Sequence, residues 1–381
     1  MKRDCLDKQK IYFPNLNGIR FIAAFLVIIH HVEQIKQIFK IDNYWKVVPF
    51  IDVIGKLGVV LFFVLSGFLI TYLLLAEQDK FKYINIKNFY IRRVLRIWPL
   101  YFLIIFLALW IFPNISIFTL PGFEKDVVYK DLILKIILYA IFFPNLVLAL
   151  FGVIPYASHT WSIGTEEQYY LVWPVLLKFF KKNRIKLMVL IIFLYLIIAK
   201  ILNSNYSDTL PYKHVIKTFW SSFNIDCMAI GGFYAILLFE KSKYLKLFMN
   251  NFVFYTTIIL TSVLIIRGVR MPYFHYEFYG SLFGIIILNF AVNGKLKISL
   301  ENKVFDYLGK LSYGLYMYHP IGIVLSLYIA IYMNCTTNWL VYPLSLFIVI
   351  LIAAISYEYY ESIFLKLKIS FSNIVSGDNS K

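Results

Sequence analysis

The chain has 381 residues, of which 60% are hydrophobic, 19% aromatic and only 15% charged. A soluble domain is closer to half apolar and a quarter charged, so this composition excludes a soluble enzyme and indicates many membrane spans in one domain. The formal net charge of +17 would suit a nucleic-acid-binding protein, but the Lys and Arg residues fall in short clusters between apolar runs. That distribution is typical of the positive-inside rule and of contact with anionic lipid, and we expect no nucleic-acid partner.

The cysteines and the N-terminal residues set further limits. Cys5, Cys227 and Cys335 lie far apart and match no ligand spacing, so we expect neither a disulfide framework nor a metal site. The chain starts with charged residues, and no small-residue cleavage site follows the first apolar run. We therefore expect that run to be a retained span and not a removed signal peptide.

Eleven apolar runs have the length needed to cross a bilayer as a helix. They lie near residues 13–35, 53–76, 94–112, 131–151, 164–180, 186–202, 219–239, 251–266, 276–293, 311–333 and 338–360. If all eleven crossed, the basic clusters at 178–186 and 241–246 would lie outside the cell. If either 131–151 or 164–180 does not cross, the inside loops hold about twice as many basic residues as the outside loops, as expected.

The predicted fold is therefore an all-α integral membrane protein, a single bundle of about ten transmembrane helices plus one re-entrant or interfacial segment. Both termini are predicted to be cytoplasmic. The domains are a cytoplasmic tail at 1–12, a transmembrane domain at 13–365 and a disordered cytoplasmic tail at 366–381. No soluble catalytic module is recognisable, so any chemistry takes place inside the bundle or at its faces.

Arg20 and His31 occupy the first apolar run, in the stretch Leu16–His31. On a helix that rises 1.5 Å per residue, they are separated by about 16 Å. If Arg20 lies near one membrane surface, His31 lies near the middle of the hydrocarbon. An ionisable residue at that depth is costly and indicates a functional site. The alternative is a structural histidine bonded to a neighbouring helix.

A second basic stretch, Phe89–Tyr101, places Arg93 and Arg96 one helical turn apart with Arg92 beside them. These side chains could simply be a positive-inside anchor whose charged ends reach the membrane surface. They could also form a clamp, because two guanidiniums at this spacing can grip a diphosphate. A cytosolic nucleotide-like donor would enter there.

The stretch His159–Pro174 carries two adjacent carboxylates, Glu166 and Glu167, into an aromatic run of spanning length. Ser162 could cap this helix, which would give Glu166 a first-turn role. A carboxylate at the start of a membrane helix could instead orient an imidazole or balance its charge.

Two smaller groups of polar residues lie within apolar runs. Ser66 and Gly67 lie in the second run, where small residues usually serve close helix packing, although Ser66 could also hydrogen-bond within a site. Ser312, Tyr316 and His319 lie in the tenth run. His319 precedes a proline, which fits a structural bond across a helix break or one wall of a cavity.

Taken together, these stretches resemble the acyltransferase 3 family, the multi-span sugar O-acyltransferases of bacterial membranes, from about Asn15 to Glu361. Arg20 and His31 match the family's arginine followed by ten residues and a histidine, and His31 rather than His30 takes the catalytic position. The other motifs match in chain order: Phe62–Phe68, Arg93–Arg96, Trp161-Ser162 with Glu166, and Ser312 to His319. Glu361 falls where members often have Glu-Lys-Pro, but serine follows here, so we assign it no role. Larger members add a periplasmic esterase-like domain, which we do not expect here.

The resemblance implies transfer of an acyl group, most often acetyl from acetyl-coenzyme A, to a hydroxyl of a lipid-linked sugar or cell-surface polysaccharide in the bacterial inner membrane. His31 would be the general base or the acyl carrier. Arg20 would position donor phosphates or stabilise the oxyanion, and Glu166 would orient or balance the imidazole. The acyl-coenzyme A site would comprise Arg92, Arg93 and Arg96, and the substrate cavity Ser66, Trp161, Ser162, Ser312, Tyr316 and His319.

Two other classes of protein fit the same residues. A transporter or flippase for a polysaccharide or lipid-linked sugar also needs polar residues within its spans, but it leaves the glycan chemically unchanged. A membrane sensor could bind an acylated ligand without turning it over.

Overall fold

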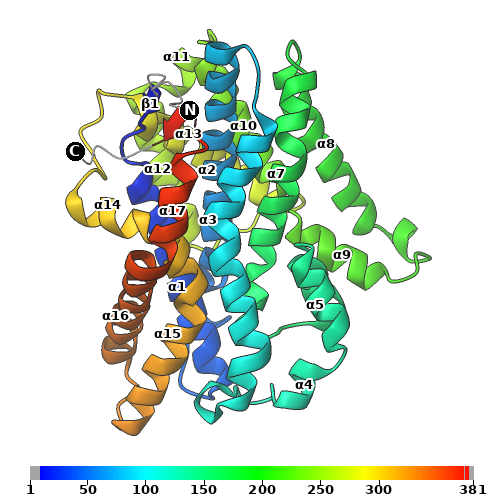
Figure 1. The fold of residues 1–381 in the computed structure, drawn as a ribbon, viewed down its shortest axis with the longest axis vertical. Coiled ribbons are helices and arrows are strands. Elements are labelled where there is room, and N and C mark those ends of the chain that lie inside the picture. The colour runs from blue at the N-terminus through cyan, green and yellow to red at the C-terminus, as the bar shows by residue number, and fades with distance from the viewer. Residues whose placement is uncertain (1–8, 373, 377–381) are drawn as a thin grey trace, which may run out of the picture.

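The structure is a computed structural model that describes residues 9–372 and 374–376, and it is helical almost throughout (Figure 1). The longer helices are α1 (Leu16–Ile38), α2 (Pro49–Phe81), α3 (Ile86–Phe106), α7 (Trp161–Phe179), α8 (Arg184–Leu202), α10 (Ile225–Phe239), α12 (Asn251–Ile266), α13 (His275–Val292), α15 (Ser312–Tyr332) and α16 (Asn338–Ser356). The shorter ones are α4 (Lys125–Tyr129), α5 (Leu132–Ala140), α6 (Pro144–Phe151), α9 (Lys213–Ser222), α11 (Leu245–Phe248), α14 (Lys303–Lys310) and α17 (Ser362–Ile369).

Local sequence explains where several of these helices begin. Pro49 is the first residue of α2, where its missing N–H would have no helical partner anyway. The Asn85 side chain caps α3 by accepting a hydrogen bond from the Asn88 backbone N–H. Pro99 and Pro320 lie inside α3 and α15, which packed membrane helices tolerate.

Within the described residues, seven helical segments are long and apolar enough to cross a membrane. They are Leu16–Ile38, Pro49–Phe81, Ile86–Asn114, Arg184–Leu202, Lys213–Phe239, Ser312–Tyr332 and Asn338–Ile369. The prediction of a helical membrane protein is confirmed, apart from one short pair of strands. The predicted count of about ten spans is not confirmed.

The two segments that the charge pattern left open differ in structure. The 131–151 segment breaks at Phe142 and Phe143, directly before Pro144, into α5 and α6. These helices have nine and eight residues, so neither is long enough to span a bilayer alone. The 164–180 segment instead lies in α7, one continuous helix of 19 residues.

The two ends of the described chain lie side by side (Figure 1). Strand β1 (Gln9–Ile11) pairs in parallel with β2 (Ile374–Ser376), and α17 packs against α3. The described part of the predicted disordered tail is therefore folded, because strand pairing and helix packing hold it. Residues 1–8 and 377–381, with Cys5 and the outer parts of both predicted tails, lie outside the described residues.

Helix α2 runs through the core, where it packs against α1, α10 and α13. Its closest approach is to α10, and it depends on two glycines. A Cβ added at Gly67 would lie 2.0 Å from the Met228 backbone oxygen, and one added at Gly231 would lie 1.9 Å from the Val64 backbone oxygen. Small residues at this contact let the two backbones touch, as the packing interpretation of Gly67 predicts.

We expect Gly67→Ala to lower the stability of the protein by about 3 kcal/mol or more, because the new methyl group meets rigid backbone. Gly294→Ala is the matched control, since a Cβ there meets nothing within 4 Å. Thermal unfolding in detergent micelles measures both. Equal unfolding temperatures for the two variants would contradict the close contact of α2 with α10.

Candidate active site

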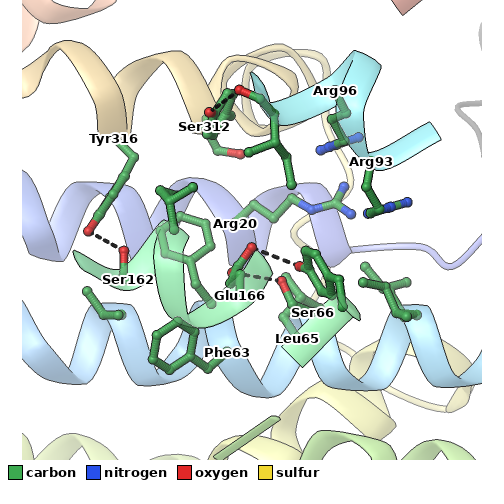
Figure 2. Close-up of a pocket in the computed structure, with 18 of the residues that line it drawn as sticks. Arg20, Phe63, Leu65, Ser66, Arg93, Arg96, Ser162, Glu166, Ser312 and Tyr316 are labelled. Carbon is green, nitrogen blue, oxygen red and sulfur yellow. Dashed lines mark hydrogen bonds between the residues drawn. The ribbon is translucent and has the colours of Figure 1, made fainter. Parts of the chain in front are cut away.

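A cavity inside the bundle brings together site residues predicted from five separate stretches of the sequence (Figure 2). Helices α1, α2, α3, α7 and α15 supply its lining. The predicted residues that line it are Arg20, Ser66, Arg93, Arg96, Ser162, Glu166, Ser312 and Tyr316. Figure 2 shows the arginines at one end, the Ser162–Tyr316 pair at the other and Glu166 between them.

The basic end of the cavity is formed by Arg20 on α1 and by Arg93 and Arg96 on α3. The Arg93 guanidinium lies 5.7 Å from the ring centroids of both Phe89 and Tyr170, and its buried Nε has no hydrogen-bond partner. Among the described residues, neither Arg93 nor Arg96 forms an ion pair with a carboxylate. Two neighbouring cations without a paired carboxylate can bind an anion.

Arg92 differs from the other two arginines of its stretch. Its Nη2 lies 3.3 Å from Glu77 Oε2, and its Nη1 donates a hydrogen bond of 2.9 Å to the Phe371 carbonyl oxygen. Its charge is thus already matched, and the side chain fixes the turn that follows α17. This arrangement fits the anchor interpretation, and donor binding by Arg92 stays a prediction.

A second, larger pocket adjoins the first, because Arg20, Arg93, Arg96 and Tyr313 line both. We call this second pocket the vestibule. Its lining includes residues from β1, β2 and α17, so both ends of the described chain contribute to it. Its other charged residues are Lys10, Glu77, Arg92, Lys310, Glu361 and Lys368.

Only one of the two adjacent carboxylates lines the cavity. Ser66 Oγ donates a 3.1 Å hydrogen bond to Glu166 Oε1, and the Tyr170 hydroxyl donates one of 2.8 Å to Oε2. Glu167 instead accepts a 3.0 Å hydrogen bond from the Trp98 indole N–H. Both oxygens of Glu166 thus have partners in the cavity wall. That Glu166 orients an imidazole or balances its charge stays a prediction.

Ser162 and Tyr316 close the far end of the cavity. Their hydroxyl oxygens lie 2.7 Å apart, and the Tyr316 hydroxyl donates its proton to the His159 carbonyl oxygen, also at 2.7 Å. Because a tyrosine has only one hydroxyl proton, Ser162 is the donor to Tyr316. Ser162 does not cap α7, which begins one residue earlier, at Trp161.

Three imidazoles lie behind Tyr316, and they come from α1, α15 and the 3₁₀ turn Ser158–Thr160. The ring centroids of His31 and His319 are 4.6 Å apart, and those of His319 and His159 are 5.0 Å apart. The His319 ring lies 5.7 Å from the ring of Tyr316, whose hydroxyl faces the cavity. His31 and His319 do not line the cavity themselves.

The hydrogen bonds of these rings identify their tautomers. His31 Nδ1 lies 2.8 Å from the Val27 carbonyl oxygen, and His319 Nδ1 lies 2.6 Å from that of Tyr316. A carbonyl oxygen can only accept, so both Nδ1 atoms carry a proton and Nε2 of each neutral ring holds the lone pair. Nε2 of His319 and Nε2 of His159 are buried without a partner. The cluster thus presents basic nitrogens inside the bundle.

The predicted residue Trp161, and His30 beside the predicted His31, also lie outside the cavity. Trp161 packs edge to face on Phe63 and lies 5.6 Å below the Lys56 ammonium. His30 donates from Nδ1 to the Ile51 carbonyl oxygen at 2.7 Å and packs on the Trp45 ring. His30 is thus held as a structural histidine.

Sequence reasoning missed three residues of this region. Tyr170 follows Glu166 by four residues, and that helical spacing could have revealed the contact. His159 opens a stretch that was singled out for its carboxylates, and only the tertiary contact with His319 distinguishes it. Lys368 carries no motif at all.

The fold and the site define a helical membrane protein with an internal cavity lined by guanidinium, carboxylate and hydroxyl groups. The family model described as an acyltransferase domain matches residues 13–358. The chain therefore belongs to the acyltransferase 3 family, and the resemblance predicted from its motifs is confirmed.

Three curated relatives are similar to the chain. A Staphylococcus aureus (strain COL) protein named "putative O-acetyltransferase" is 26% identical over 94% of this chain and 58% of its own length. The peptidoglycan O-acetyltransferase OatA of Listeria monocytogenes is 32% identical over 48% of this chain and 26% of its own. The Bacillus subtilis protein YrhL, named as a "putative peptidoglycan O-acetyltransferase", is 30% identical over 51% and 29%. The chain thus spans 58% or less of each relative, and no solved structure matches it.

We expect Tyr316→Phe to lower stability by about 1–3 kcal/mol, because it removes two buried hydrogen bonds of the Tyr316 hydroxyl, one from Ser162 and one to the His159 carbonyl. Tyr332→Phe on the same helix is the control, since Tyr332 is 89% exposed and should change stability by less than about 0.5 kcal/mol. Chemical or thermal unfolding of the purified protein gives both values. A Tyr316→Phe variant as stable as the control would refute the hydroxyl pair.

Proposed function

We propose that this protein is an O-acyltransferase of the bacterial cytoplasmic membrane. It moves an acyl group, acetyl in the first instance, from cytosolic acyl-coenzyme A to a hydroxyl of a lipid-linked sugar or cell-surface polysaccharide. One observation carries the proposal. A single cavity within the membrane bundle is lined by Arg93 and Arg96, which have no ion-pair partner among the described residues, and by Tyr316, which we call the tyrosine wall. The imidazoles lie behind this wall. The relatives named as peptidoglycan O-acetyltransferases support a glycan acceptor.

The shape of the donor fits the order of groups along the cavity. Coenzyme A carries a diphosphate, for which Arg93 and Arg96 are suited, and Arg20 lies beside them to position the phosphates. The pantetheine arm and the acyl group then extend towards Glu166 and Tyr316. The Glu166 carboxylate can accept a hydrogen bond from an amide of that arm, since carboxylates accept more than one.

The chemistry is assigned to His31. Its Nε2 takes the proton of the acceptor hydroxyl as the hydroxyl oxygen attacks the thioester carbonyl, and the coenzyme leaves as a thiol when that proton is passed on. In the alternative sequence Nε2 attacks the carbonyl itself as the C–S bond breaks, and the coenzyme thiolate takes the proton that the ring gives up. The acyl group then passes to the acceptor hydroxyl, whose proton returns to the ring. Because Tyr316 separates the cavity from the imidazoles, either sequence requires the Ser162–Tyr316 pair to move when the donor binds.

The proposed orientation places the vestibule in the cytosol. Lys10, Lys310 and Lys368 line it, and strand β1, which pairs with β2, lies at the same end of the bundle as the basic loop before α3 (Figure 1). Cytoplasmic loops and tails are enriched in Lys and Arg. The imidazoles then lie deeper in the membrane, where an acceptor arriving from the outer face can meet the acyl group.

We expect Arg93→Ala and Arg96→Ala each to weaken binding of acetyl-coenzyme A roughly tenfold or more, since each removes a charge-assisted contact to phosphate. Lys366→Ala, an exposed lysine on α17, is the control and should bind as the wild type does. Calorimetry on protein in lipid nanodiscs gives the affinities. Unchanged affinity in both arginine variants would remove the clamp.

We expect His31→Ala to abolish O-acylation in cells while the protein level stays normal, because the variant lacks the Nε2 to which the chemistry is assigned. His30→Ala should retain most activity per folded protein, since that ring only bonds the Ile51 carbonyl. Mass analysis of surface glycans, before and after mild base removes the ester, measures the modification. A glycan of unchanged mass in the presence of the wild-type protein would favour a transporter, and full activity in His31→Ala would reassign the base.

A further inference from the structure

Lys368 brings a further cation to the vestibule from outside the part of the chain that defines the family. It lies on α17, beyond residue 358, where the family match ends. It lines the vestibule but not the inner cavity. It lines the same pocket as Arg93 and Arg96, so these like charges repel one another. Among the described residues, no carboxylate forms an ion pair with it.

The structure holds this lysine in place despite that repulsion. The Arg92 guanidinium bonds the Phe371 carbonyl at 2.9 Å, and the Ser372 hydroxyl donates to the Lys368 carbonyl at 3.1 Å. The strand pair β1–β2 then fixes the segment that follows. These backbone contacts keep Lys368 near other cations in spite of their repulsion. Such an arrangement indicates an anion site, because a bound anion removes the repulsion.

The carboxylates of the vestibule do not neutralise Lys368. Glu77 is paired with Arg92, and Glu361 accepts a 3.3 Å hydrogen bond from Ser356. The cations of the vestibule lie at two depths. Arg20, Arg93 and Arg96 line both pockets and so mark the junction, whereas Lys368 lines only the outer one, as do Lys10, Arg92 and Lys310. The vestibule thus offers one anion site at the junction and another outside it.

Coenzyme A carries its phosphates in a matching order. Along the molecule from the thioester come pantetheine, the diphosphate, and the ribose with its 3′-phosphate. With pantetheine in the inner cavity and the diphosphate at the junction, the 3′-phosphate falls in the outer part of the vestibule. A phosphate monoester there carries close to two negative charges at neutral pH.

We propose that Lys368 binds the 3′-phosphate of coenzyme A and makes the site prefer coenzyme A over dephospho-coenzyme A. This inference rests on the proposed donor. It adds Lys368 to the donor site, and it adds a preference for the 3′-phosphate that Arg93 and Arg96 alone do not supply. It also gives α17 and the Arg92–Glu77 pair a function, because they position the lysine at the vestibule.

The test compares the two ligands, which differ only in the 3′-phosphate, on the full chain in nanodiscs. We expect the wild type to bind coenzyme A about tenfold more tightly than dephospho-coenzyme A, the size of one charge-assisted contact. In Lys368→Ala that preference should disappear: affinity for coenzyme A falls about tenfold and affinity for dephospho-coenzyme A stays the same. Lys368→Arg should keep the preference, and the exposed Lys366→Ala should match the wild type.

Each other outcome overturns a defined part of the proposal. A Lys368→Ala variant that loses affinity equally for both ligands places the lysine on the diphosphate, and a variant that keeps the wild-type preference removes it from the site. If Lys366→Ala and Lys368→Ala lost the same affinity for coenzyme A, the effect would come from general surface charge and not from a specific contact. Added salt would then screen it. A wild type that binds neither ligand would refute the donor, and the proposed function with it.

Discussion

The close contact between α2 and α10 is the interaction on which the site depends. Gly67 and Gly231 let the two backbones touch, and this contact fixes the position and rotation of α2 in the core. Ser66 is the residue beside Gly67, and its hydroxyl reaches Glu166 on α7. The packing interpretation of Gly67 is therefore compatible with a site role for its neighbour Ser66, because one residue lets the helices touch and the other lines the cavity.

Charge in a membrane interior must be either matched or used, because water is not there to solvate it. This protein matches Arg92 with Glu77 and with the Phe371 carbonyl, and that bond also ties the C-terminal segment to the vestibule. Arg93 and Arg96, one turn away or less, have no ion-pair partner among the described residues. The three arginines of this stretch thus divide into one anchor, Arg92, and two cations available to a ligand, Arg93 and Arg96.

Patterns confined to one helix could be read from the sequence: the rise of α1 between Arg20 and His31, and the single turn between Arg93 and Arg96. Contacts between helices could not. Tyr316 lies between the cavity and His31 because α15 packs beside α1 and beside the turn before α7. No periodic pattern in the sequence predicts this packing. The break of 131–151 at Phe142 was indicated only by Pro144, while Lys368 depends on a strand pair between the two ends of the described chain.

The free energy needed to open the tyrosine wall follows from the hydrogen bonds that hold Tyr316 in place. Opening it breaks two bonds of the Tyr316 hydroxyl, to Ser162 and to the His159 carbonyl, each with a net value of about 0.5–1.5 kcal/mol. The total, about 1–3 kcal/mol, is no larger than what one or two phosphate contacts at the arginines contribute. In the proposed reaction, binding of the donor at the vestibule would therefore offset the opening of the inner wall. A wall that closes again once the donor has left would keep water on the vestibule side away from the imidazoles, and would protect from hydrolysis an acyl group carried there.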